Sequence, residues 1–87
     1  MNILVAAESV LLRAALARLL EDAGMRVVAQ ARDAEQTVRK ARAHRPDVVV
    51  LALADAPPRE ELSGAGVLVL AEDERAAMSV LSAEPRG

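Results

Sequence analysis

Short apolar runs alternate with amphipathic stretches along this chain. The runs are bounded by polar residues, glycine or proline, a pattern that is typical of buried β-strands. The predicted strands cover residues 3–7, 25–29, 48–53 and 66–70. The run at 48–53 is apolar throughout and rich in valine, which predicts a central parallel strand that is covered on both faces.

The first stretch between two runs predicts a helix over residues 10–22. Ser9 is placed to accept a hydrogen bond from the first turn, and Gly24 suits the position just beyond the last turn. Apolar residues recur at helical spacing and should form one stripe toward the core. This stripe consists of Leu12, Leu16, Leu19 and Leu20.

A second helix is predicted between Asp33, a candidate N-cap, and Pro46, which ends it. Gln36 lies three residues after Asp33, the spacing of a capping box. The inward stripe consists of Ala34, Val38 and Ala41. A basic cluster, expected to be a solvated helix face or a contact for an acidic partner, consists of Arg39, Lys40, Arg42 and Arg45.

The remaining segments complete an alternating pattern. Residues 54–66 contain two prolines and predict a loop with at most one helical turn. Residues 72–81 predict a last helix, and 82–87 a frayed end; the inward residues of that helix are Ala76, Ala77, Val80 and Leu81. Alternation of strands and helices predicts one α/β domain over residues 1–87, with four parallel strands, right-handed crossovers and about three helices.

The composition narrows the possible chemistry. The chain has 87 residues, no aromatic residue, no cysteine and a formal net charge of −2. Its core must therefore be aliphatic, and base stacking and thiolate chemistry are excluded. The net charge argues against direct nucleic-acid binding, and no apolar run approaches the roughly 20 residues that span a bilayer. We expect a soluble cytoplasmic protein without a cofactor and without membrane contact.

Several segments resemble the receiver domains of NarL/LuxR-type response regulators. Residues 3–13 resemble the first strand of these domains and the helix that follows it, and residues 26–31 look like their second strand. The most specific piece is Arg-Pro-Asp-Val-Val-Val-Leu at 45–51, which is close to the entry into their third strand. Residues 67–70 resemble the fourth. The likeness implies a flavodoxin-like, doubly wound sheet of order 2-1-3-4-5, here cut short before a fifth strand.

The resemblance also implies where the family's catalytic residues would fall, and this chain departs from each of them. The acidic pair falls on Ala7 and Glu8, the phospho-accepting aspartate on Ala52, and the Thr or Ser after the fourth strand on Ala71. The fifth strand with its lysine has no counterpart before Gly87. Acyl-phosphate formation needs a carboxylate nucleophile, which a methyl group cannot replace. We therefore expect a degenerate receiver, or pseudo-receiver, that is not an enzyme, with Ala52 packed in the core.

The acidic residues Glu8, Asp55 and Glu72 are best explained as solvated positions near helix starts, and a weak cation site is the less favoured alternative. With such a site, Asp55 or Glu8 could serve as a metal-dependent phosphoacceptor in place of the missing aspartate. A third reading is a structural fragment of a larger response regulator without independent function.

The favoured hypothesis is a phosphorylation-independent module for protein interaction or dimerisation in signalling or transcription regulation. Without a fifth strand, the fourth would present an open edge that can pair with another chain. The expected interface consists of Val67, Val69, Ala77, Val80 and Leu81. A homodimer through the fourth strand and last helix is favoured over capture of a strand from a partner or from the rest of the same protein.

Overall fold

The computed structural model describes residues 1–70 of the chain. Its elements are β1 (Asn2–Ala7), α1 (Val10–Asp22), β2 (Arg26–Ala31), α2 (Ala34–His44), β3 (Val48–Ala52), the 3-10 turn η1 (Arg59–Glu61) and β4 (Gly66–Val69). The helix predicted at 72–81 and the end predicted at 82–87 lie outside the described residues. Within the first 70 residues, no helix combines the length and the apolar character needed to cross a membrane.

The four strands form one parallel sheet of order β2-β1-β3-β4. This confirms the predicted α/β class and the order 2-1-3-4 of an incomplete flavodoxin-like fold. Most strand bounds agree with the prediction to within a residue, but β2 extends to Ala31 because Gln30 and Ala31 still pair with β1. The β1–β2 register shifts between Ile3 and Leu4, so the two strands are joined across a bulge.

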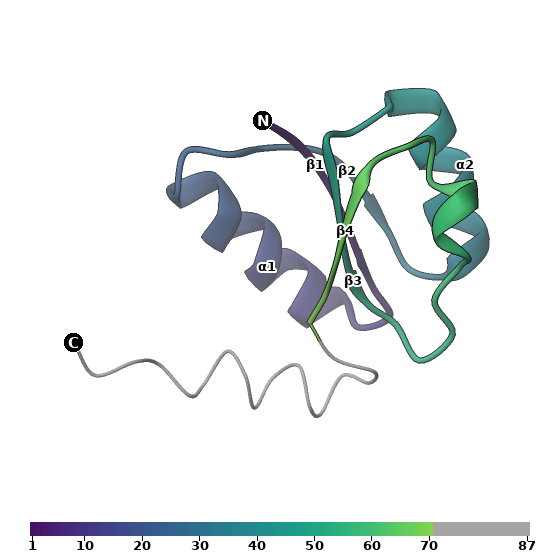
Figure 1. Cartoon of the computed structure of the whole chain (residues 1–87). Helices are drawn as coiled ribbons and strands as arrows, with labels where there is room; N and C mark the ends of the chain where they lie inside the picture. Colours follow the sequence, from purple (N-terminus) through teal and green to yellow (C-terminus); the bar gives the residue numbers. More distant parts are fainter. Residues whose placement is uncertain (71–87) are drawn as a thin grey trace.

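Each face of the sheet carries a separate aliphatic core. Figure 1 views the sheet nearly edge-on, with α1 on one side and α2 on the other. Successive residues of a strand point to opposite faces. The core on the α1 side contains Ile3, Val5, Ala7, Leu12, Leu16, Val50 and Ala52. The core on the α2 side contains Leu4, Ala6, Ala31, Ala41, Val49, Leu51, Leu53 and Leu62.

Helix α1 begins and ends as predicted, but its buried stripe lies to one side of the expected one. The Ser9 hydroxyl accepts from the Leu12 N–H at 3.2 Å, and Gly24 has φ +90° just beyond the C-cap. Leu19 was expected in the core, yet 56% of its surface is exposed. The buried face of α1 includes Ala17 and is therefore centred further round the helix than predicted. Leu19 lies just outside this face, on the side away from Ala17.

Helix α2 also has the predicted N-cap, since the Asp33 carboxylate accepts from the Gln36 N–H at 2.8 Å. The Gln36 side chain reaches back to the N–H of Arg32, one residue earlier than in a capping box. The most buried polar residue is Thr37, which the prediction left out. Its hydroxyl donates to the Asp33 carbonyl at 2.6 Å, so this polar group is buried without being unsatisfied.

The apolar run of β4 predicted a buried strand, and this was wrong, whereas the edge position expected for β4 is the one it has among residues 1–70. Leu68 is 51% exposed and Val69 is 57% exposed. The apolar run indicated a strand correctly, but β4 lies at the edge of the four-stranded sheet. The helices contact mainly β1 and β2, so β4 is less covered than an interior parallel strand would be.

Candidate functional site

The carboxyl ends of β1 and β3 are the first place to look for a site. In open parallel sheets, ligands bind in the crevice outside the carboxyl ends of the strands, at the point where the strand order reverses. Here the reversal falls between β1 and β3, and the facing residues at that end are Ala7 and Ala52. Both are buried, with exposed fractions of 0% and 1%. The prediction that Ala52 is a packed core residue is confirmed.

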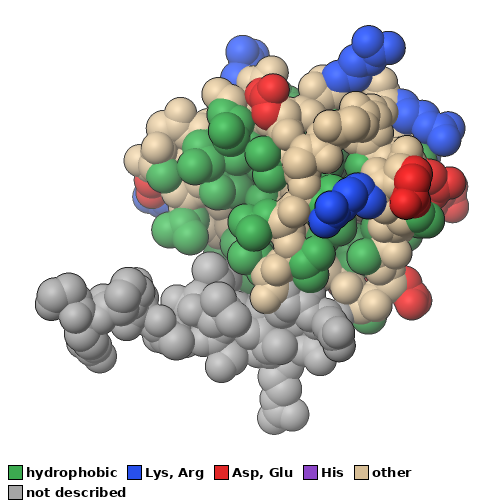
Figure 2. All heavy atoms as spheres, in the orientation of Figure 1, with side chains coloured by type: hydrophobic (Ala, Val, Ile, Leu, Met, Phe, Trp, Pro, Cys, Tyr) green, Lys and Arg blue, Asp and Glu red, His purple; other side chains and the backbone are tan. Residues whose placement is uncertain are grey.

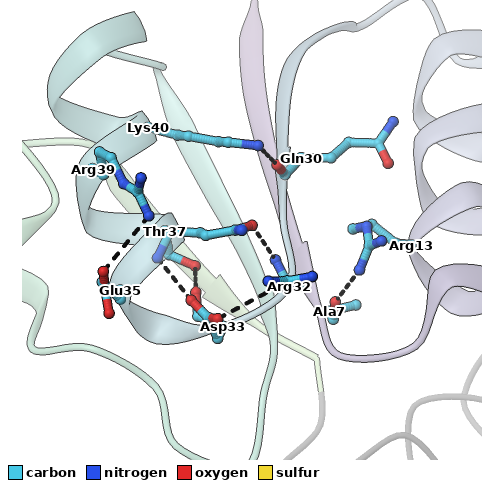
Figure 3. A network of polar contacts seen from close by, with 10 residues as sticks. Ala7, Arg13, Gln30, Arg32, Asp33, Glu35, Thr37, Arg39 and Lys40 are labelled. Carbon is cyan, nitrogen blue, oxygen red and sulfur yellow. Dashed lines mark hydrogen bonds and ion pairs between the residues drawn. The ribbon is translucent and has the colours of Figure 1, made fainter.

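This end of the sheet is closed by apolar groups and by Arg13. The Arg13 guanidinium donates through Nη1 to the Ala7 carbonyl at 2.7 Å, as Figure 3 shows. That bond satisfies the last carbonyl of β1 from the first turns of α1. Ala7 and Ala52 offer only methyl groups, so neither can act as a nucleophile or hold a cation. Arg13 was not singled out from the sequence, because nothing there indicates which carbonyl it contacts.

The acidic residues named as a possible cation site do not form one among the described residues. Glu8 and Asp55 are both exposed. No group of at least three Asp, Glu, His or Cys side chains that could hold a metal occurs among residues 1–70. Glu72 and Ala71, the other two positions named for this end of the sheet, lie outside the described residues. Glu8 and Asp55 therefore have no third ligand within that range.

A groove of about 860 Å³ lies between α2 and the connection from β3 to β4. Asp55 belongs to its wall, together with charged residues of both signs. The rest of its lining is mostly apolar and consists of Ala34, Val38, Ala43, Ala56, Pro57 and Pro58. Leu62 anchors the connection in the α2-side core. The sequence indicated the loop but not the groove, which depends on how the loop packs against α2.

The predicted basic cluster does not act as one free positive face. Arg39 forms an ion pair with Glu35 at 3.7 Å, and the Lys40 ammonium donates to the Gln30 carbonyl of β2. Figure 3 shows Arg39 and Lys40 directed to these different partners. Arg39 and Arg42 both line the groove beside α2. Two of the four basic side chains thus already have partners within the domain, which weakens the expectation of an acidic partner docking on this helix.

The outer edge of β4, which belongs to the predicted interface, carries exposed apolar side chains. Of the residues predicted for that interface, Val67 is half-buried and Val69 is exposed. The other three, Ala77, Val80 and Leu81, lie outside the described residues. Figure 2 shows hydrophobic side chains gathered between α1 and β4 on this side of the molecule. Leu68 belongs to this edge but was not named from the sequence, because its side chain was expected to be covered.

A second exposed apolar strip follows the outer face of α1. It borders a shallow groove of about 420 Å³, lined by Leu11, Ala14, Ala15, Arg18, Leu19 and Asp22. Leu11 is 69% exposed. Arg18 and Asp22 are within 3.9 Å of each other at the end of this strip, on the helix surface. The strip is continuous, but unlike β4 it offers no unpaired backbone groups.

Comparisons with protein-family models, with curated proteins and with solved structures found no match. The strand order 2-1-3-4 shows the incomplete flavodoxin-like fold, and the resemblance to receiver domains stays a prediction from the residues that carry it.

Proposed function

We propose that this chain is a phosphorylation-independent, receiver-like module that acts by protein contact in signalling or transcription regulation. The observation that carries the proposal is the pairing of two buried alanines, Ala7 and Ala52, at the carboxyl ends of the central strands. A phosphoacceptor site needs carboxylates at that place, and the two facing alanines supply none, whereas the adjacent Glu8 is exposed.

The exposed β4 edge supports the second half of the proposal, contact with another protein. Leu68 and Val69 are each more than half exposed. Large apolar side chains beside the unpaired backbone of an edge strand favour pairing with a further chain. The contact surface is thus separate from the end of the sheet where phosphorylation chemistry would take place.

The proposal is tested by incubating the full chain with acetyl phosphate and magnesium chloride and then measuring its mass. The expected result is an unchanged mass and an unchanged melting temperature in magnesium. A phosphorylatable receiver domain, treated in parallel, controls for active reagent. A gain of one phosphoryl group on Asp55 or Glu8 would favour a cation-dependent phosphoacceptor and overturn the proposal.

A further inference from the structure

The backbone of β4 is polarised across the strand. The N–H of Gly66 donates to the Asp47 carbonyl and the N–H of Leu70 donates to the Leu51 carbonyl, each at 2.9 Å. Both bonds point toward β3. The backbone N–H and C=O groups of successive residues point to opposite edges of a strand. Those of Leu68 therefore also point toward β3, whereas those of Val67 and Val69 point away from it. Among residues 1–70, no strand pairs with that outer side.

The outward groups are arranged symmetrically about Leu68. The segment Val67-Leu68-Val69 reads the same in both directions. A two-fold axis at Leu68 therefore brings Val67 opposite Val69 of a second copy in an antiparallel ladder. Residues that face each other through their outward groups exchange both hydrogen bonds, so the two such pairs form about four bonds. Leu68 then lies opposite its own counterpart in a non-hydrogen-bonded pair.

The side chains of β4 suit this self-pairing. Leu68 is 51% exposed and Val69 is 57% exposed, and both would be covered by the second copy. Residues 66–70 include no charge and no proline. A symmetric contact places each charge near its own like, so the absence of charge removes the repulsion that such a contact would otherwise meet.

We infer that the partner of this module is a second copy of the chain, joined by antiparallel β4–β4 pairing about a two-fold axis at Leu68. This inference rests on the proposed function, because it names the partner of the same edge. The two sheets become one continuous sheet across the dimer. The contact is limited to one short strand from each copy, so the dimer is expected to be weak.

The register is tested by single cysteine substitutions, which are clean because the chain has no cysteine of its own. At Leu68→Cys the two Cα atoms across the axis are about 4.5 Å apart, within the range that a disulfide spans. At Val67→Cys the two equivalent residues are diagonal neighbours about 7–8 Å apart and point to the other face. Leu19→Cys is the matched control for exposure, because Leu19 on α1 is 56% exposed.

The three full-length variants are first checked for unchanged circular dichroism and then oxidised with glutathione disulfide at equal concentration. Leu68→Cys is expected to form covalent dimer at least tenfold faster than Val67→Cys and Leu19→Cys. Equal rates for Leu68→Cys and Leu19→Cys would overturn the inference, and so would faster cross-linking of Val67→Cys. Such a failure with no phosphoryl uptake leaves the proposed function standing with a different partner, whereas phosphoryl uptake overturns the proposed function whatever the cross-linking shows.

Discussion

The two edges of the sheet are built differently. The β2 edge begins with the exposed Arg26, is bulged against β1, and has the Gln30 carbonyl bonded by the Lys40 ammonium from α2. Bulges and charged side chains, lysine above all, are the devices by which natural proteins prevent edge strands from pairing. The β4 edge has none of these among residues 66–70, and its apolar side chains are exposed.

Every open sheet has two edge strands, so the feature that needs an explanation is the difference between them. Both β2 and β4 terminate the same parallel sheet, yet only β2 carries obstacles to pairing. Among residues 1–70, one edge is protected and the other is apolar without such protection, which is consistent with use of the second edge for a contact. Three substitutions can break or sharpen this comparison, beginning with the centre on which both edges depend.

Ala52→Asp should have the largest effect, because β3 connects β4 to the rest of the sheet. The new carboxylate would lie in the α1-side core, and the Arg13 guanidinium at this end of the sheet is already bonded to the Ala7 carbonyl, so we expect a cost of about 2–4 kcal/mol in unfolding free energy at neutral pH. The loss should shrink at lower pH, because burial raises the pKa of the introduced carboxyl and its neutral form is cheaper to bury. Urea unfolding measures this, with the exposed Ala54→Asp as control. An unchanged or higher stability of Ala52→Asp would contradict the dry packing of this position.

Val69→Lys should have the next largest effect, on association and not on folding. It gives β4 the kind of charge that β2 already has, and a symmetric pairing would bring two lysines close to the ladder. We expect the dimer to weaken at least about tenfold, or about 1.4 kcal/mol. Sedimentation equilibrium over micromolar to millimolar concentrations measures it, with Leu19→Lys on α1 as control for a charge at similar exposure. Identical association of the wild type and Val69→Lys would rule out β4 as the contact.

Lys40→Met should have the smallest effect. It removes the ammonium from the Gln30 carbonyl, and the unfolding free energy should fall by less than about 1 kcal/mol because the bond is exposed. Arg39→Met is the control, since Arg39 lies on the same helix but pairs with Glu35. Combined with Val69→Lys, the Lys40→Met substitution should restore a small amount of self-association through β2, detectable by light scattering. If the double variant stays as monomeric as Val69→Lys, then Lys40 does not protect that edge.

Much of the fold could be predicted because local signals and tertiary structure agree. The Ser9 and Asp33 caps, the stop at Gly24 and the valine-rich run of β3 each depend on residues close in sequence, and each is present in the structure. What failed depends on neighbours far along the chain. The apolar run that contains Leu68 predicted burial, because periodicity alone cannot tell an interior strand from an outer one. The edge position came only from the strand order that the receiver resemblance implied.

The features of the candidate site also fall into those that the sequence predicted and those that depend on contacts between distant residues. The sequence predicted that Ala52 is packed in the core, and the structure confirms this, with Ala7 buried opposite it. The closure by Arg13 and the groove beside α2 were not visible, because each needs a side chain to meet a backbone or loop that the sequence places at no fixed distance. The N–H groups of β4 that point away from β3 and have no partner strand among residues 1–70 likewise follow from its register with β3, which no local pattern specifies.

The strand order also constrains which strand pairs depend on which others. Strand β1 has β2 on one side and β3 on the other, and the start of β3 is held to β1 by a hydrogen bond between Asn2 and Asp47, which are 45 residues apart in the chain. Strand β4 follows the other three strands in the sequence and, among residues 1–70, pairs only with β3. Non-local parallel pairings of this kind form slowly. Among residues 1–70, β4 pairs with β3 alone, so its outer edge acquires the flat, ordered geometry needed for regular pairing only when β3 is itself in the sheet.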